Sequence, residues 1–243
     1  MLGTFVNAGT VIIGSLLGFL FKKGIPEKVK SAVMIGISLC TMYIGISGSL
    51  SGENTIVVIF SIILGAIVGT LLNIDGGINR LGGWVENKFG AKDGQPVSLA
   101  QGFVTASLLF CIGAMTITGS LQSGLTGDHT IIFTKSVLDF ISSIMLTATL
   151  GIGVIFSAAF VLVFQGAIVL LAEVLAPVLT TSAINDMTCV GSLLIIALSL
   201  NMLNITKIKV ANYLPSIVFV PIVCKLAEVL SDIFNLYIQP LFG

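Results

Sequence analysis

Charged residues are scarce in this chain, and that scarcity is the first constraint on its structure. Only 9% of the 243 residues are Asp, Glu, Lys or Arg, whereas 56% are hydrophobic and the mean hydropathy is +1.12. Soluble domains carry about 25% charged residues, so most of the outer surface here must face lipid rather than water. The formal net charge is zero. Nucleic acid is therefore excluded as a partner, because phosphate binding needs a basic excess.

The motifs of common enzymes and metal sites are also absent. The sequence has no phosphate loop with its lysine, no dinucleotide glycine fingerprint, no His-Glu-x-x-His helix and no Gly-x-Ser-x-Gly turn. Its four cysteines lie in apolar stretches without metal-ligand spacing, and the single histidine, His129, is predicted to be a solvated loop residue. We therefore expect no enzymatic activity, no catalytic residue, no metal and no cofactor. Transport, if any, would be passive or driven by a gradient.

What the chain does contain is a series of long apolar runs. A membrane-spanning helix needs about 20 apolar residues. The predicted spans are Leu2–Phe21, Ser31–Leu50, Thr55–Ile74, Leu99–Ser120, Ile131–Leu150, Gly153–Leu179, Thr188–Ile205 and Val210–Leu230. They predict an all-α polytopic membrane helix bundle of about eight spans, in a single transmembrane domain over residues 1–243. The short joint Gly151–Gly153 leaves open a re-entrant hairpin in place of a full fifth span.

Basic residues alternate between the connections that join these spans. Nine of the eleven Lys and Arg residues follow spans one, three and seven, and the connections after spans two, four and six contain none. The nine are Lys22, Lys23, Lys28, Lys30, Arg80, Lys88, Lys92, Lys207 and Lys209. Under the positive-inside rule these connections are cytoplasmic, which places both termini outside. Two amphipathic segments, Ile78–Phe89 and Ser231–Phe242, are predicted to lie at the interface.

The two ends of the chain show a weak likeness to each other. Asn7-Ala-Gly-Thr-Val-Ile-Ile-Gly in span one resembles Gln165-Gly-Ala-Ile-Val-Leu-Leu-Ala in span six, and in both ends an apolar span precedes an amphipathic segment. The offset of five spans would give the two triplets opposite orientations. The pattern suggests inverted three-span repeats, residues 1–90 and 151–243, flanking a central two-helix insert in residues 98–150. The sequence alone leaves this repeat open.

A glycine-rich polar stretch interrupts the fourth span. Gly113, Gly119, Gly124 and Gly127 punctuate it. Its side-chain oxygens come from Thr116, Thr118, Ser120, Gln122 and Ser123, and Asp128 follows. A broken helix at membrane depth is tolerated only around a protein-lined or water-filled cavity, where its free peptide groups bind ions or solutes. A helix cap followed by an outer loop explains the same residues, and both interpretations stay open.

Two charged residues lie inside the fifth span. The four-residue spacing of Lys135 and Asp139 puts both on one helical face, so they can pair. Charges inside a span are costly and usually face the bundle interior, where they mark an ion or proton path. A neutralised pair that only holds two helices together is the alternative.

Buried carboxamides are the remaining candidates. Asn7 and Gln165 occupy matching positions in the suggested repeats, and brought together across a pseudo-two-fold axis they would coordinate a cation or bind a solute. Interhelical hydrogen bonds, worth about 0.6–2 kcal/mol, account for each one taken separately. The spacings Gly14-x-x-x-Gly18 and Gly65-x-x-x-Gly69 predict close packing of spans one and three within a subunit.

Several of these segments also resemble a known family. Gly3-Thr-Phe-Val-Asn7, the run Leu108–Asp128, Lys135-Ser-Val-Leu-Asp139, Gly151-Ile-Gly-Val and Gln165-Gly are similar to the YdfK/YqgA-type bacterial membrane proteins. The resemblance covers nearly the whole chain and implies a multi-pass protein of the bacterial cytoplasmic membrane. It implies no substrate, because that family has no assigned function.

These observations lead to two functional hypotheses. The first is a small secondary transporter or ion-conducting protein, with a solute or ion bound by Asn7, the Thr116–Asp128 stretch, Lys135, Asp139 and Gln165. The second is a membrane scaffold or sensor that transports nothing. The expected partners are the lipid bilayer and, under the first hypothesis, a small solute or ion; homo-oligomerisation stays open.

Overall fold

The computed structural model describes residues 1–21, 27–80 and 99–233, and this part of the chain is built from helices with no strand. The longer helices are α1 (Leu2–Phe21), α2 (Glu27–Ser49), α3 (Thr55–Leu71), α5 (Leu99–Cys111), α6 (Ala114–Leu125), α7 (Thr130–Leu150), α8 (Ser157–Leu170), α10 (Thr181–Met202) and α11 (Pro215–Ile233). The short ones are Ile74–Arg80, η1 (Ile152–Phe156), α9 (Ala172–Leu175) and η2 (Val210–Tyr213). The predicted all-α polytopic bundle is confirmed.

The number of crossings depends on how two bent helix pairs are counted. Six described helices are long and apolar enough to cross a membrane, and the number rises to eight if each bent pair forms one span. The pairs are α3 with Ile74–Arg80, bent by 49°, and α5 with α6, bent by 61°. Helix α7 is one of the six, at 21 residues, which favours a full fifth span over a re-entrant hairpin.

Close approaches at glycines fix the relative directions of the helices. Gly3 lies against Ile132 and Gly18 lies against the Ile144 carbonyl, so α1 and α7 run parallel. The pairs α2/α10 and α3/α11 run antiparallel, as shown by the approaches of Gly45 to Ile196, Gly48 to Ser192, Gly65 to Ser216 and Gly69 to Asn212. Eight spans that cross the membrane in alternating directions would give these same relative directions. Lys28 in the first turn of α2 lies at the same end of the bundle as Arg80, Lys207 and Lys209, and we call this end the basic end.

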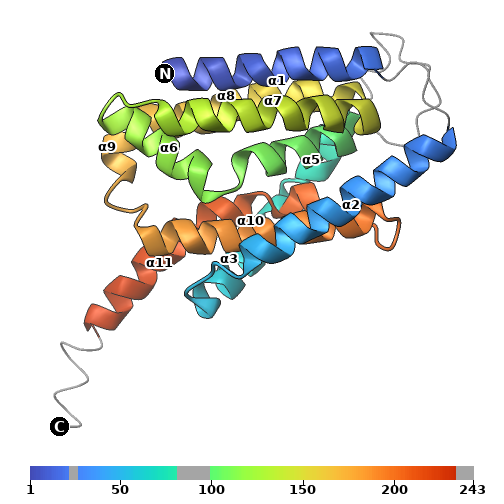
Figure 1. Cartoon of the computed structure of the whole chain (residues 1–243). Helices are drawn as coiled ribbons and strands as arrows, with labels where there is room; N and C mark the ends of the chain where they lie inside the picture. The colour runs from blue at the N-terminus through green and yellow to red at the C-terminus, as the bar shows by residue number, and fades with distance from the viewer. Residues whose placement is uncertain (22–26, 81–98, 234–243) are drawn as a thin grey trace.

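The helices form two groups with a broken helix between them. In Figure 1, α1, α7 and α8 lie together on one side, and α2, α3, α10 and α11 lie on the other. Helices α5 and α6 run between the two groups, and α10 is the most enclosed long span. The outer faces of both groups carry exposed apolar side chains, such as Ile13, Ile63 and Ile141, which suit contact with lipid tails.

Two predicted segments differ from the structure at their ends. Helix α10 begins at Thr181, seven residues before the predicted span, and the Thr180 hydroxyl caps it by accepting from the Ala183 N–H at 3.2 Å. The polar residues Asn185 and Asp186 lower the hydropathy of the first two turns of α10, which is why the apolar run starts later than the helix. The amphipathic segment Ile78–Phe89 is described only as far as Arg80, and most of Ser231–Phe242 lies outside the described residues.

Both small-residue motifs pack helices within the chain, as predicted. Gly14 and Gly18 bring α1 against α7, while Gly65 and Gly69 bring α3 against η2 and the start of α11. A Cβ placed on Gly69 would lie 1.8 Å from the Asn212 carbonyl oxygen. The backbones are therefore in contact and leave no space for a side chain at this position.

Gly69→Ala should consequently lower the free energy of unfolding by about 1–3 kcal/mol, the usual range for overpacking. The measurement is thermal unfolding of the purified protein in detergent. Gly36→Ala is the matched control, because a Cβ at Gly36 in α2 meets nothing within 4 Å. That substitution should leave stability unchanged or raise it by up to about 1 kcal/mol, since alanine is the better helix former. Equal melting temperatures for the two variants would contradict the packing described.

Candidate functional site

The candidate site begins at the break between α5 and α6. Gly113 precedes α6 with φ 138°, a backbone conformation that side chains disfavour, and α6 then continues to Leu125. Of the two sequence interpretations, the structure therefore has the broken helix. Thr116 is fully buried, and its hydroxyl donates to the Phe110 carbonyl across the break at 3.1 Å. One of the carbonyls freed at the end of α5 is thus satisfied by the chain itself.

A buried charge pair lies beside this break. Lys135 and Asp139 form the predicted ion pair on α7, and each residue is 6% exposed. The Asn7 amide of α1 donates to the same oxygen, Asp139 Oδ2, at 3.0 Å. The Lys135 ammonium also lies 5.9 Å from the centre of the Phe110 ring at the end of α5, a cation–π distance. Asp139 follows Thr130 by nine residues, about 14 Å along the helix, so the network lies near the middle of α7.

Further buried polar groups lie between this network and the end of the bundle opposite the basic end. Gln165 on α8 is fully buried, and neither its carboxamide oxygen nor its nitrogen has a hydrogen-bond partner among the described residues. Asn7 Oδ1 and the hydroxyls of Thr4 and Ser120 are also buried and have no partner in this part of the chain. The glycine beside each of three of these residues indicates its depth in the bundle. Gly3 beside Thr4 and Gly119 beside Ser120 pack on Ile132, and Gly166 beside Gln165 packs near Met1. These groups therefore form a layer close to the first turns of α1 and α7.

Four helices enclose this polar layer. Helices α1, α6, α7 and α8 each contact two of the others, in the order α1, α7, α6, α8 and back to α1. The polar side chains named so far in this region all belong to these four helices. Phe110, which contributes its ring and its backbone carbonyl, belongs to α5. We call Thr4, Asn7, Ser120, Lys135, Asp139 and Gln165 the buried polar cluster.

Other predicted site residues lie outside this cluster. Gln122 donates to Asp128 Oδ2 at 2.8 Å at the exposed end of α6. Asp128 is exposed, and hydrogen bonds from the Thr130 side chain and backbone N–H hold its pKa below the usual value. Thr118 lies on α6 and is half-buried. Asp128 lies in the connection between α6 and α7, where its carboxylate accepts from Thr130, the first residue of α7.

Two sequence-based expectations need correction here. His129 is half-buried rather than solvated, since its Nδ1 lies 2.7 Å from the Ser123 hydroxyl and its ring packs edge-on against Phe133. Asn7 and Gln165 make no hydrogen bond to each other. Asn7 instead donates to Asp139 near the middle of α7, and Gln165 has no hydrogen-bond partner among the described residues. The described contacts therefore do not bring the two carboxamides together.

The sequence interpretation missed one buried carboxylate, Asp186 on α10. It is fully buried, and its Oδ1 accepts from the backbone N–H groups of Glu53 and Asn54 at 2.8 and 3.0 Å. Asp186 therefore holds the connection before α3 against α10. The signal available in the sequence was an acidic residue directly before an apolar run, but its partner lies 132 residues away.

Comparisons with known proteins agree with this picture. A family model described as protein of unknown function (DUF554) matches residues 2–225. The chain belongs to the DUF554 family. It is 35% identical over 227 residues to the uncharacterized membrane protein YdfK of Bacillus subtilis (strain 168), covering 92% of this chain and 95% of YdfK. It is 30% identical over 219 residues to the uncharacterized protein YqgA of Escherichia coli (strain K12), covering 89% and 93%. No solved structure matches the chain.

The predicted resemblance is thus confirmed, and the DUF554 chain is a membrane protein. Its buried polar cluster contains one ammonium and one carboxylate that balance each other, together with amide and hydroxyl groups. No group of three or more metal-binding side chains occurs in the part of the DUF554 chain that the structure describes. The cluster offers hydrogen bonds and a neutral charge pair, which suit binding of a small polar solute or a monovalent ion.

Proposed function

We propose that this protein is a small secondary transporter or ion-conducting protein whose site is the buried polar cluster. The observation that carries the proposal is Gln165, whose carboxamide is fully buried with both polar atoms unpartnered. Such a group costs about 1–3 kcal/mol of stability when it stays unsatisfied, and binding of water or a ligand removes this cost. Asn7 Oδ1, Thr4 and Ser120 extend the same unpartnered surface.

The chemistry of the cluster limits the solutes that suit it. Lys135 and Asp139 already neutralise each other, so a ligand with net charge would leave a charge uncompensated at membrane depth. An uncharged or zwitterionic solute fits without this cost. A monovalent cation fits if Lys135 gives up its proton, which would couple ion movement to proton movement. The most buried members of the cluster are closed off in this conformation, so passage requires movement of the surrounding helices.

The helix arrangement supports an inverted repeat as the basis of that movement. Each helix of the first half contacts its counterpart in the second half: α1 contacts α8, α2 contacts α10, and α3 contacts α11. The two helices of each pair run antiparallel. The α5–α6 and α7 helices lie between the halves in sequence as the central insert. We further propose that the basic end faces the cytoplasm of a bacterial inner membrane, which would place both termini outside.

The test is flux into proteoliposomes. Vesicles with the reconstituted protein are compared with empty vesicles for Na⁺, K⁺, protons, and a panel of radiolabelled neutral and zwitterionic metabolites. At least one of these should enter faster than into empty vesicles. If all of them move at the empty-vesicle rate, the transport proposal is wrong.

A membrane scaffold or sensor is the second candidate, and one observation favours it. The Asn7–Asp139–Lys135 network is internally satisfied and would hold α1 against α7 without any ligand. A scaffold predicts that no solute of the panel raises the melting temperature in detergent. A transporter predicts that its solute does, because binding to the folded state alone stabilises it.

A further inference from the structure

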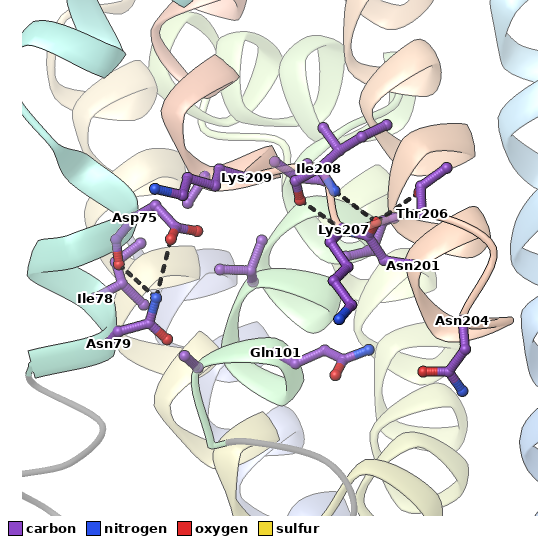
Figure 2. Close-up of a pocket in the computed structure, with 15 residues that line it drawn as sticks. Asp75, Ile78, Asn79, Gln101, Asn201, Asn204, Thr206, Lys207, Ile208 and Lys209 are labelled. Carbon is purple, nitrogen blue, oxygen red and sulfur yellow. Dashed lines mark hydrogen bonds between the residues drawn. The ribbon is translucent and has the colours of Figure 1, made fainter.

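A cavity of about 300 Å³ opens at the basic end of the bundle, away from the buried polar cluster (Figure 2). Four segments form its wall: the helix Ile74–Arg80, the first turns of α5, the last turns of α10 and the connection that follows α10. Asp75, Asn79, Gln101, Asn201, Lys207 and Lys209 are its main polar residues. Its volume lies at the lower end of the range for small-molecule sites, which is about 300–1,000 Å³.

The connection that carries both lysines is held in one conformation by Asn201. Its Oδ1 accepts from the Thr206 hydroxyl at 2.7 Å and from the Ile208 N–H at 2.9 Å, and its Nδ2 donates to the Ile208 carbonyl at 2.7 Å. The Asn201 carboxamide thus makes three of the four hydrogen bonds that it can form within the chain. Its effect is to place Lys207 and Lys209, one on each side of Ile208, at the cavity (Figure 2).

The two lysines are exposed, and no carboxylate of the described residues forms an ion pair with either of them. Within the described residues, neither ammonium has a carboxylate within 4.0 Å, since the ion pairs there are Lys135–Asp139 and Lys225–Glu228. Figure 2 shows the Lys207 side chain extending toward Gln101, and Lys209 on the side of Asp75. Asp75 is the one carboxylate among the described residues of the wall, and it accepts from Asn79 Nδ2 at 3.0 Å. The described part of the wall therefore has an excess of positive charge.

We propose that this cavity binds a phosphate group, held by the ammonium groups of Lys207 and Lys209. A phosphate monoester carries about −1.5 to −2 charges and three acceptor oxygens, and the phosphodiester of a lipid headgroup carries one charge and two such oxygens; either offers several acceptors to two ammonium groups. The apolar part of the wall, including Ile78, Val104 and Leu198, suits the carbon portion of the ligand. The phosphate belongs to a small soluble ester or to an anionic lipid headgroup, because both are found at the basic face of a membrane.

The experiment measures ligand-induced shifts in melting temperature for the full chain in a non-ionic detergent. The probes are glycerol 3-phosphate, dihexanoyl phosphatidylglycerol, and dihexanoyl phosphatidylcholine as the zwitterionic control. At least one of the first two should stabilise the wild type, and the Kd should rise at least tenfold in Lys207→Gln/Lys209→Gln. Stabilisation by glycerol 3-phosphate identifies a soluble ester, whereas stabilisation by phosphatidylglycerol alone identifies a lipid headgroup.

Two further variants keep the test independent of folding defects. Lys28→Gln/Arg80→Gln removes the same charge from the same end of the bundle outside the cavity wall, and it should bind as the wild type does. Asp75→Asn removes the repelling carboxylate and should lower the Kd about threefold, a gain that misfolding cannot produce. The proposal is overturned if neither anion binds, if phosphatidylcholine stabilises equally, or if both double variants lose binding to the same extent. These outcomes are separate from solute flux through the buried polar cluster.

Discussion

Asp139→Asn should lower the free energy of unfolding by about 3–5 kcal/mol, because it leaves the Lys135 ammonium buried without its counter-charge. Lys135 is 6% exposed, and Asp139 is its only described ion-pair partner, so no nearby carboxylate replaces the lost one. Lys135→Met should be destabilising for the converse reason, since the Asp139 carboxylate then keeps only the Asn7 hydrogen bond. Thermal unfolding in detergent measures both effects.

The double variant Lys135→Met/Asp139→Leu is the decisive comparison. It removes both charges together and replaces them with apolar groups of similar size, a change that is often neutral for a buried pair. We expect it to recover most of the stability, short of about 1–2 kcal/mol for the unpaired Asn7 amide. If the double variant is no more stable than the two single ones, the pair is not coupled as described.

The chain offers a matched control for this series. Lys225 and Glu228 form an ion pair of 2.9 Å near the end of α11, with side chains 60% and 54% exposed. Exposed pairs contribute about 0–1 kcal/mol, so Lys225→Met should change stability by less than 1 kcal/mol. Flux then tests whether the Lys135–Asp139 pair takes part in transport. A folded double variant that has lost transport assigns the pair to the site, and one that transports normally limits it to holding α1 and α7 together.

Local features of the sequence predicted a large part of this structure. The apolar runs and the alternating basic residues predicted spans whose relative directions the glycine contacts reproduce. The four-residue spacing predicted the Lys135–Asp139 pair, and the glycines predicted the break at Gly113 as one of two interpretations. Each of these features depends on residues within one helix or one connection, where periodicity and composition carry the information.

The features that were missed depend on contacts between distant segments. Asn7 meets Asp139 across 132 residues, and Asp186 meets Asn54 across the same separation. No periodicity within a helix tells which helix lies beside it. The same limit explains Gln122 and Asp128, which belong to the polar stretch in sequence but end at the exposed tip of α6. The sequence thus shows which helices carry polar side chains. The pairing of the helices decides which of these side chains meet.

Gln165→Leu should raise the melting temperature while it lowers transport, the opposite of what a structural hydrogen bond would give. The side chains are similar in size, and leucine removes two buried polar atoms that have no hydrogen-bond partner among the residues that the structure describes. Each such atom costs about 1–3 kcal/mol, so a gain of a few kcal/mol is the expected upper range. Loss of one or two hydrogen bonds to the solute should reduce the flux at low solute concentration at least tenfold, about 1.4 kcal/mol.

Gln122→Leu provides the same chemical change at a partnered carboxamide, since Gln122 donates to Asp128 at the exposed end of α6. It should lower stability by less than about 1 kcal/mol and leave the flux unchanged. An unsatisfied amide at a position where leucine would be more stable lowers the stability of the protein. Binding sites commonly show such a loss of stability, because their residues are selected for function. If Gln165→Leu instead destabilises the protein more than Gln122→Leu does, Gln165 serves the fold, and the transport proposal loses the observation that carries it.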